Sequence, residues 1–322
     1  MNKFVIILLS FGLTTGTVKA QSIADTAGLQ FLLQEFNKRN LSNVNSWEMY
    51  AYTNNEHIKK NKEYFRNNSL PDSLLINSKC LGDFNRDGIK DILINIAKLP
   101  EPTKKRDRVD FRSIVVFFNN LGVDTCIDLN PEFSHTITYS SSTKKRASDL
   151  IVIVEYSNRN DMAVFVKRSD TLQYYKNGFI NHSSEKYHKT VKTVNYYATS
   201  PWYYNKMNEI TILSEGVLFL NERHGLDSLF NYHYVINKKE AADFFGLLRK
   251  IDFENMNATY TIDGVFDAST AHLIIEFTDG SKKYIRDYDS YGNHSLRYVY
   301  SIIKKYIKYS NWHLIKMNLD RS

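Results

Sequence analysis

A short loop near residue 85 carries oxygen-bearing side chains at the spacing that a hard cation requires. Residues 82–94 read GDFNRDGIKDILI. Counted from the first aspartate, oxygen side chains stand at positions 1, 3, 5 and 9, and the glycine at position 6 permits a sharp turn. Position 7 would offer its main-chain carbonyl. We therefore expect a structural Ca²⁺ site in this loop, and its candidate ligands are Asp83, Asn85, Asp87, Ile89 and Asp91.

Position 12 separates this loop from two helix-loop-helix types. An EF-hand has a bidentate glutamate there and dockerins have an aspartate, but this chain has Ile94, inside an apolar stretch. The loop instead resembles the calcium loop of FG-GAP and VCBS-like repeats, which leads into a strand. Propellers carry several such loops and this chain has one, so the resemblance is to secreted bacterial proteins with a single loop, over residues 75–160. It implies architecture rather than activity. The alternative is an Asx-rich β-turn without metal.

The first twenty residues have the layout of a secretory signal peptide. Lys3 supplies a basic start, Phe4–Leu13 is apolar, and small residues precede Ala20. The apolar stretch is shorter than the roughly 20 residues that a membrane span needs. We expect cleavage near Ala20 and export to the periplasm or the extracellular space, the alternative being a short N-terminal anchor. No later segment is apolar enough to span, so we expect no membrane span.

Composition places the chain among folded proteins of about two domains. It has 322 residues, of which 43% are hydrophobic and 24% charged, with a net charge of +7. The basic residues are dispersed, and their densest cluster, Lys104 to Arg106, is typical of a solvated loop. An exported protein of this kind is not expected to bind nucleic acid. Cys80 and Cys126 could form a disulfide in an oxidising compartment or remain buried thiols.

The pattern of apolar residues predicts an α+β fold with a β-rich N-terminal domain and a smaller α+β C-terminal domain. A helix is expected over residues 24–40, and β-structure begins near residue 74. We place the β-rich domain at residues 21–180, a linker at 181–200 and the second domain at 201–322. The expected strands of the first domain are residues 74–80, 89–97, 113–118, 123–129, 150–156, 162–167 and 171–175.

The C-terminal half alternates short strands with two helices. Strands flank Glu215-Gly216, a hairpin crosses Asp279-Gly280, and helices are expected over residues 238–251 and 296–309. This order resembles a small domain of unknown function found in exported bacterial proteins. That family often carries a Cys-x-Gly-x-Cys-Pro segment near its first strand. Residues 205–210 hold no cysteine here, which removes any redox or metal role of such a pair.

Other candidates for chemistry are weaker. His182, Glu185 and His188 lie in a polar segment without the helical spacing that zinc sites use, so no zinc is expected. Asp287 and Asp289 are typical turn formers, and the nucleophile-elbow, P-loop and dinucleotide motifs are absent. We expect a non-catalytic binding or interaction protein of the envelope or extracellular space, with a protein or glycan ligand. The alternatives are a secreted hydrolase of peptide or glycan and an inhibitor or immunity-type protein.

Overall fold

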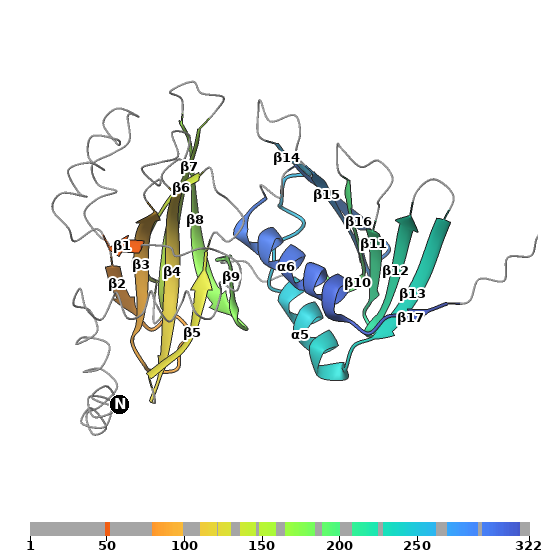
Figure 1. Ribbon diagram of the computed structural model, residues 1–322, viewed down its shortest axis with the longest axis horizontal. Coiled ribbons are helices and arrows are strands. Elements are labelled where there is room, and N and C mark those ends of the chain that lie inside the picture. Colours follow the sequence, from red (N-terminus) through yellow and green to blue (C-terminus); the bar gives the residue numbers. More distant parts are fainter. Residues whose placement is uncertain are drawn as a thin grey trace, which may run out of the picture. The chain divides into compact units, whose positions relative to one another are not determined.

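The computed structural model divides the chain into two compact units, Met1–Asn177 and Gly178–Ser322. Antiparallel strands dominate the described residues and two helices lie in the second unit, so the fold is broadly α+β, as predicted (Figure 1). The expected signal peptide and the helix over residues 24–40 lie outside the described residues. The structure describes residues 49–51, 79–98, 110–120, 122–129, 136–145, 148–158, 165–183, 189–199, 208–224, 228–261, 269–288 and 292–315.

The first sheet of the first unit contains the strand that follows the predicted calcium loop. Its order is β1-β3-β4-β5, and β2 also pairs with β3. Ile92, Leu93 and Ile94 of β3 are each at most 1% exposed, so this strand is covered on both faces. The strands predicted at residues 113–118 and 123–129 correspond to β4 and β5, which pair as an antiparallel hairpin. The strands are β1 (Met49–Ala51), β2 (Lys79–Gly82), β3 (Asp91–Lys98), β4 (Asp110–Asn119) and β5 (Gly122–Asp128).

The second sheet has the order β6-β7-β8-β9. β6 was not predicted from the sequence, and the predicted division of β8 at residues 168–170 is wrong. Arg168 and Asp170 pair with β7 across an unbroken ladder. They point to the same side of the strand, where Arg168 Nη2 lies 2.9 Å from Asp170 Oδ2. The strands are β6 (Thr136–Lys145), β7 (Ser148–Asn158), β8 (Phe165–Tyr175) and β9 (Gly178–Asn181).

A buried polar network joins the two sheets of the first unit. Asn95 of β3 donates from Nδ2 to the Ser140 carbonyl of β6 at 2.8 Å. Asn95 Oδ1 accepts from the Ser140 amide at 2.9 Å and from the hydroxyls of Ser140 and Ser113 at 2.9 and 2.7 Å. All three residues are at most 2% exposed. One amide side chain therefore connects β3, β4 and β6 inside the core.

The two cysteines are too far apart in the first sheet to be bonded to each other. Cys80 of β2 lies opposite Leu93 of β3, and Cys126 of β5 lies opposite Val116 of β4. Two strands separate them, and strands are about 4.8 Å apart. The resulting gap of about 14 Å exceeds the roughly 7 Å that a disulfide can bridge. Of the two interpretations left open by the sequence, the structure supports reduced thiols.

The second unit is built on one eight-stranded sheet, in the order β14-β16-β15-β10-β11-β12-β13-β17. The hairpin across Asp279-Gly280 is confirmed: Gly280 has a φ of 82°, and the Phe277 amide bonds to the Ser281 carbonyl. The strands are β10 (Val191–Thr199), β11 (Asn208–Leu213), β12 (Val217–His224), β13 (Ser228–Val235), β14 (Thr259–Tyr260), β15 (Thr270–Phe277), β16 (Lys282–Tyr288) and β17 (His313–Leu314).

Residues 181–200 are not a linker throughout, because β10 is a central strand of this sheet. It pairs with β11 on one side and β15 on the other. Val191, Val194 and Tyr196 are buried, while lysine, threonine and asparagine occupy four of the other six positions. The segment has few large apolar residues, and lysine, threonine and asparagine stand between them. Its composition is therefore polar, although it is a central strand of the sheet.

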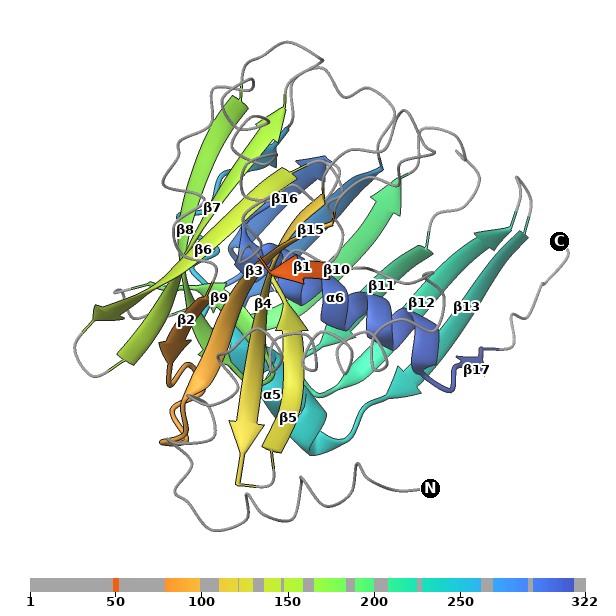
Figure 2. The ribbon, with the colours of Figure 1, turned by 60° about the vertical axis from the view of Figure 1, so that its left-hand side comes forward.

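Two helices cover one face of the eight-stranded sheet (Figure 1). α5 (Lys238–Leu248) begins with a capping box between Asn237 and Glu240, and Asn293 caps α6 (His294–Tyr309). Figure 2 shows α6 crossing the sheet from β15 towards β13. Its Tyr300 ring lies 5.5 Å from the Tyr196 ring of β10. Both helices were predicted, and neither described helix is long and apolar enough to cross a membrane.

Candidate functional site

The predicted calcium loop connects β2 to β3. Its backbone turns through two residues with positive φ, Arg86 at 66° and Gly88 at 87°. Glycine suits this left-handed region because it has no Cβ to collide with the backbone. Asp83 and Asn85 are half-buried, and Asp87 is exposed. The loop therefore places its first three candidate ligands at or near the surface.

Hydrogen bonds gather the side chains at positions 1, 3 and 5 of the loop. The Asp83 carboxylate accepts from the amides of Asp87 and Gly88, both at 3.1 Å. Asn85 Nδ2 donates to Asp87 Oδ2 at 2.8 Å, and Asp87 Oδ1 accepts from the Ile89 amide at 2.8 Å. These are the contacts of successive Asx turns. The structure thus brings Asp83, Asn85 and Asp87 together in one turn.

Asp91, at position 9, is directed into the core of the first unit. It is fully buried, and its Oδ2 accepts from the Phe84 amide at 2.9 Å. Its Oδ1 accepts from the Phe118 amide of β4 at 3.3 Å. Burial raises the pKa of Asp91 to about 7, although the two amides oppose the shift. Asp91 therefore ties the loop to the neighbouring strand, a role that the sequence pattern did not indicate.

Asp149 attaches the loop to the second sheet. This residue of β7 accepts from the Asp83 amide at 2.7 Å and lies 3.6 Å from Lys90 Nζ. At Gly82, an added Cβ would lie 2.7 Å from the Phe84 ring and 3.3 Å from Asp149. Glycine at position 82 therefore lets the strand, the buried Phe84 ring and β7 approach closely. Because Asp149 is 66 residues from Asp83, no local sequence signal could have identified it.

The donor set of the loop suits a hard cation. Asp83, Asn85 and Asp87 offer side-chain oxygens, and Ile89 offers a main-chain carbonyl, which are the groups that Ca²⁺ binds. In the described residues, no group of three or more His, Cys, Asp or Glu side chains is arranged to hold a metal ion. Both Asp91 oxygens already accept from main-chain amides. A cation at this loop would therefore depend on two carboxylates, an amide and the backbone, with Asp91 as the candidate fifth ligand.

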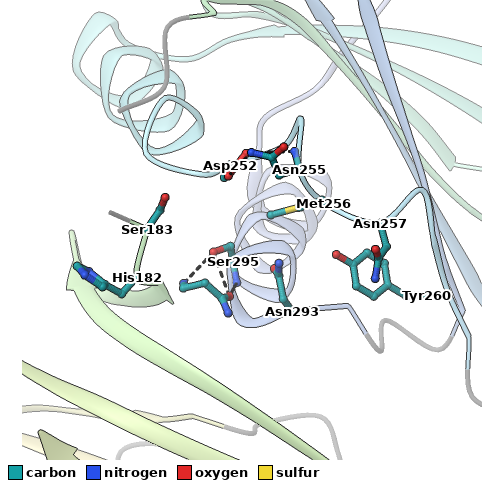
Figure 3. Close-up of a pocket in the computed structure, with 10 residues that line it drawn as sticks. His182, Ser183, Asp252, Asn255, Met256, Asn257, Tyr260, Asn293 and Ser295 are labelled. Atoms are coloured by element: carbon teal, nitrogen blue, oxygen red, sulfur yellow. Dashed lines mark hydrogen bonds between the residues drawn. The ribbon is translucent and has the colours of Figure 1, made fainter. Parts of the chain in front are cut away.

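A polar pocket of about 630 Å³ lies in the second unit (Figure 3). Three separate segments form it: the end of β9 and the two residues after it, the segment that runs from the end of α5 into β14, and the N-cap and first turn of α6. Of its residues, only His182 was a candidate from the sequence. The lining consists of Asn181, His182, Ser183, Asp252, Asn255, Met256, Asn257, Tyr260, Asn293 and Ser295.

Asp287, one of the two aspartates that were considered as turn formers from the sequence, has a structural role. Asp287 is fully buried at the end of β16 and accepts from the Gly292 amide at 2.8 Å. A Cβ on Gly292 would collide with the Asp287 carboxylate. Burial, together with the charge of Asp287, raises the pKa of Tyr300 well above its usual value. Asp289, Glu185 and His188 lie outside the described residues.

Comparison with known proteins gives a match for part of the second unit. Residues 197–307 match a family described as a domain of unknown function, DUF6438. This match covers β11, β12 and β13, all of α5, the β15–β16 hairpin and most of α6. It confirms the expected resemblance of the C-terminal half to a domain of unknown function. No curated protein and no solved structure matches the chain.

Proposed function

We propose that this chain is an exported, non-catalytic binding protein whose first unit is stabilised by one Ca²⁺ ion. The observation that carries the proposal is the loop between β2 and β3, where Asp83, Asn85 and Asp87 are held together by hydrogen bonds. The FG-GAP and VCBS-like spacing of the same residues supports calcium as the ion. Ile89, through its carbonyl, and Asp91 complete the proposed ligand set.

A structural role for the ion follows from what the loop connects. Asp91 joins the loop to β4, and Asp149 joins it to β7 of the other sheet. A cation would offset the repulsion between carboxylates that stand close together in the loop. Exported calcium modules bind with a Kd of about 10⁻⁴–10⁻³ M. At millimolar calcium, binding of that strength adds about 1 kcal/mol to the free energy of unfolding.

Binding rather than catalysis is supported by the pocket of the second unit. Hydrolysis of glycosides commonly uses two carboxyl groups on opposite sides of the scissile bond. Among the described lining residues the pocket has one carboxylate, Asp252, and both of its oxygens accept hydrogen bonds from Asn255, at 3.1 and 2.9 Å. The hydrolase and the inhibitor remain the alternatives.

Export is proposed from the first twenty residues alone. Cleavage after Ala20 would make Gln21 the first residue of the mature protein. N-terminal sequencing of protein recovered from the periplasm or the medium checks this point. Recovery of the uncleaved chain in the cytoplasm would contradict it.

We expect Asp87→Ala to remove the calcium dependence of stability. Wild-type protein should melt at a higher temperature in about 2 mM calcium than in EDTA, since only the folded loop presents the complete ligand set. In Asp87→Ala the two melting curves should coincide, because one charged ligand is lost. The matched control is Asp124→Ala, an exposed carboxylate of β5 outside the loop. A calcium shift that survives in Asp87→Ala would place the ion elsewhere.

A further inference from the structure

We propose that the polar pocket of the second unit binds a neutral saccharide. This inference deepens the proposed binding function by naming a ligand class and a site. A volume of about 630 Å³ lies within the roughly 300–1,000 Å³ that is usual for small-molecule sites. Such sites are mostly apolar, whereas this one is lined by amide and hydroxyl side chains. Its ligand should therefore be polar over most of its surface.

The side chains of the lining match the hydrogen-bonding chemistry of a sugar. Four of the ten residues are asparagines and two are serines. A side-chain amide both donates and accepts hydrogen bonds, and so does every sugar hydroxyl. Because the Oδ1 atoms of Asn181 and Asn293 already accept from main-chain amides, sugar hydroxyls would pair with the Nδ2 groups of these two residues and with the exposed side-chain amide of Asn257. The Met256 thioether and the Tyr260 ring provide apolar surface for the C–H groups of the ring (Figure 3).

The charges at the pocket favour a neutral ligand. The described lining includes neither lysine nor arginine, the residues that recognise carboxylates and phosphates. Its single carboxylate, Asp252, already accepts hydrogen bonds from the main-chain amide and from the side-chain Nδ2 of Asn255. An anionic ligand would thus find no lysine or arginine among these residues, and a cationic ligand would have to compete with Asn255 for Asp252.

The pocket is held in place by contacts that do not depend on a ligand. Asn181 and Ser295 bond to each other in both directions. The main-chain amide of Asn181 donates to Ser295 Oγ at 2.8 Å, and the main-chain amide of Ser295 donates to Asn181 Oδ1 at 3.0 Å. Figure 3 shows Ser295 at the start of α6. On the segment between α5 and β14, Lys283 Nζ donates to the carbonyls of Glu254 and Met256 at 3.1 and 2.6 Å. A preorganised site loses less entropy when it binds its ligand.

The test is a titration of the full chain with three neutral disaccharides: maltose, cellobiose and N,N′-diacetylchitobiose. Calorimetry with about 10 mM of each sugar detects millimolar affinities. Galacturonic acid and glycine are the charged and zwitterionic comparisons. The first variant is Asn257→Ala, which removes an exposed lining amide, and the second is Asn257→Trp, which adds bulk to the wall. The matched control is Asn231→Ala on β13, outside the lining.

We expect at least one neutral disaccharide to bind, with about three- to tenfold weaker binding in Asn257→Ala, because one hydrogen bond is lost. Binding should be absent in Asn257→Trp and unchanged in Asn231→Ala. Failure of all three sugars to bind would overturn the proposal, as would a preference for galacturonic acid or glycine, or binding that is indifferent to Asn257. The variant Asp87→Ala separates the two proposals, since sugar binding should persist there whether or not the loop binds calcium.

Discussion

Replacing Asn95 by alanine is expected to lower the free energy of unfolding of the first unit by about 3 kcal/mol. Asn95 is 2% exposed and makes four hydrogen bonds with Ser140 and Ser113. Its removal leaves the buried amide and carbonyl of Ser140 without these partners, in a place where water cannot easily replace them. Urea unfolding followed by circular dichroism measures the loss.

The control for this variant is Asn120→Ala, which changes an exposed asparagine just after β4 of the same unit. It should alter the free energy of unfolding by no more than about 0.5 kcal/mol. If Asn95→Ala were as stable as this control, the network between β3, β4 and β6 would not contribute to stability. A Ser113→Ala variant should cost less than Asn95→Ala, because Asn95 Oδ1 keeps its two bonds from Ser140.

Replacing Asp91 by alanine is expected to destabilise the first unit by about 2–3 kcal/mol even when calcium is absent. The substitution leaves the amides of Phe84 and Phe118 without the carboxylate that accepts from both. It also opens a cavity beneath the loop, since Asp91 is fully buried. The measurement is urea unfolding in EDTA, where any contribution from calcium is removed.

Two comparisons make the Asp91 prediction specific. Asp91→Asn retains one oxygen acceptor at nearly the same volume, so it should lose less stability than Asp91→Ala. Asp87→Ala in EDTA should stay within about 1 kcal/mol of wild type, because Asp87 is exposed. Equal stability of Asp91→Ala and wild type in EDTA would show that Asp91 acts only as a metal ligand, contrary to the hydrogen bonds that we describe.

The elements that the sequence predicts well are those with strong local signals. The Asp279-Gly280 hairpin has a turn residue that adopts positive φ, and α5 has both a capping box and a periodic apolar face. The strand β3 is a mostly apolar stretch, interrupted by Asn95, directly after a turn-rich loop. In each case the deciding interactions lie within a few residues of one another, so they can be recognised in the sequence.

The features that were missed depend on contacts between distant residues. β6 is largely serine, threonine and lysine, and it is a strand because it pairs with β7 and because Asn95, 45 residues away, holds its centre. β10 looks polar because only Val191, Val194 and Tyr196 of its nine residues are buried. The pocket combines segments that are more than 100 residues apart, and Asn181 and Ser295 meet only in the folded unit.

The most direct test of the central claim is a titration of calcium into metal-free protein, followed by calorimetry. We predict one Ca²⁺ bound per chain, with a Kd of about 10⁻⁴–10⁻³ M, through the loop that contains Asp83, Asn85 and Asp87. Magnesium should bind more weakly, because it demands near-octahedral geometry and gives up its waters reluctantly. The contradicting result is a titration that gives no binding heat, together with equilibrium dialysis at about 2 mM calcium that finds no bound ion. The loop would then be an Asx-rich turn held by its own hydrogen bonds.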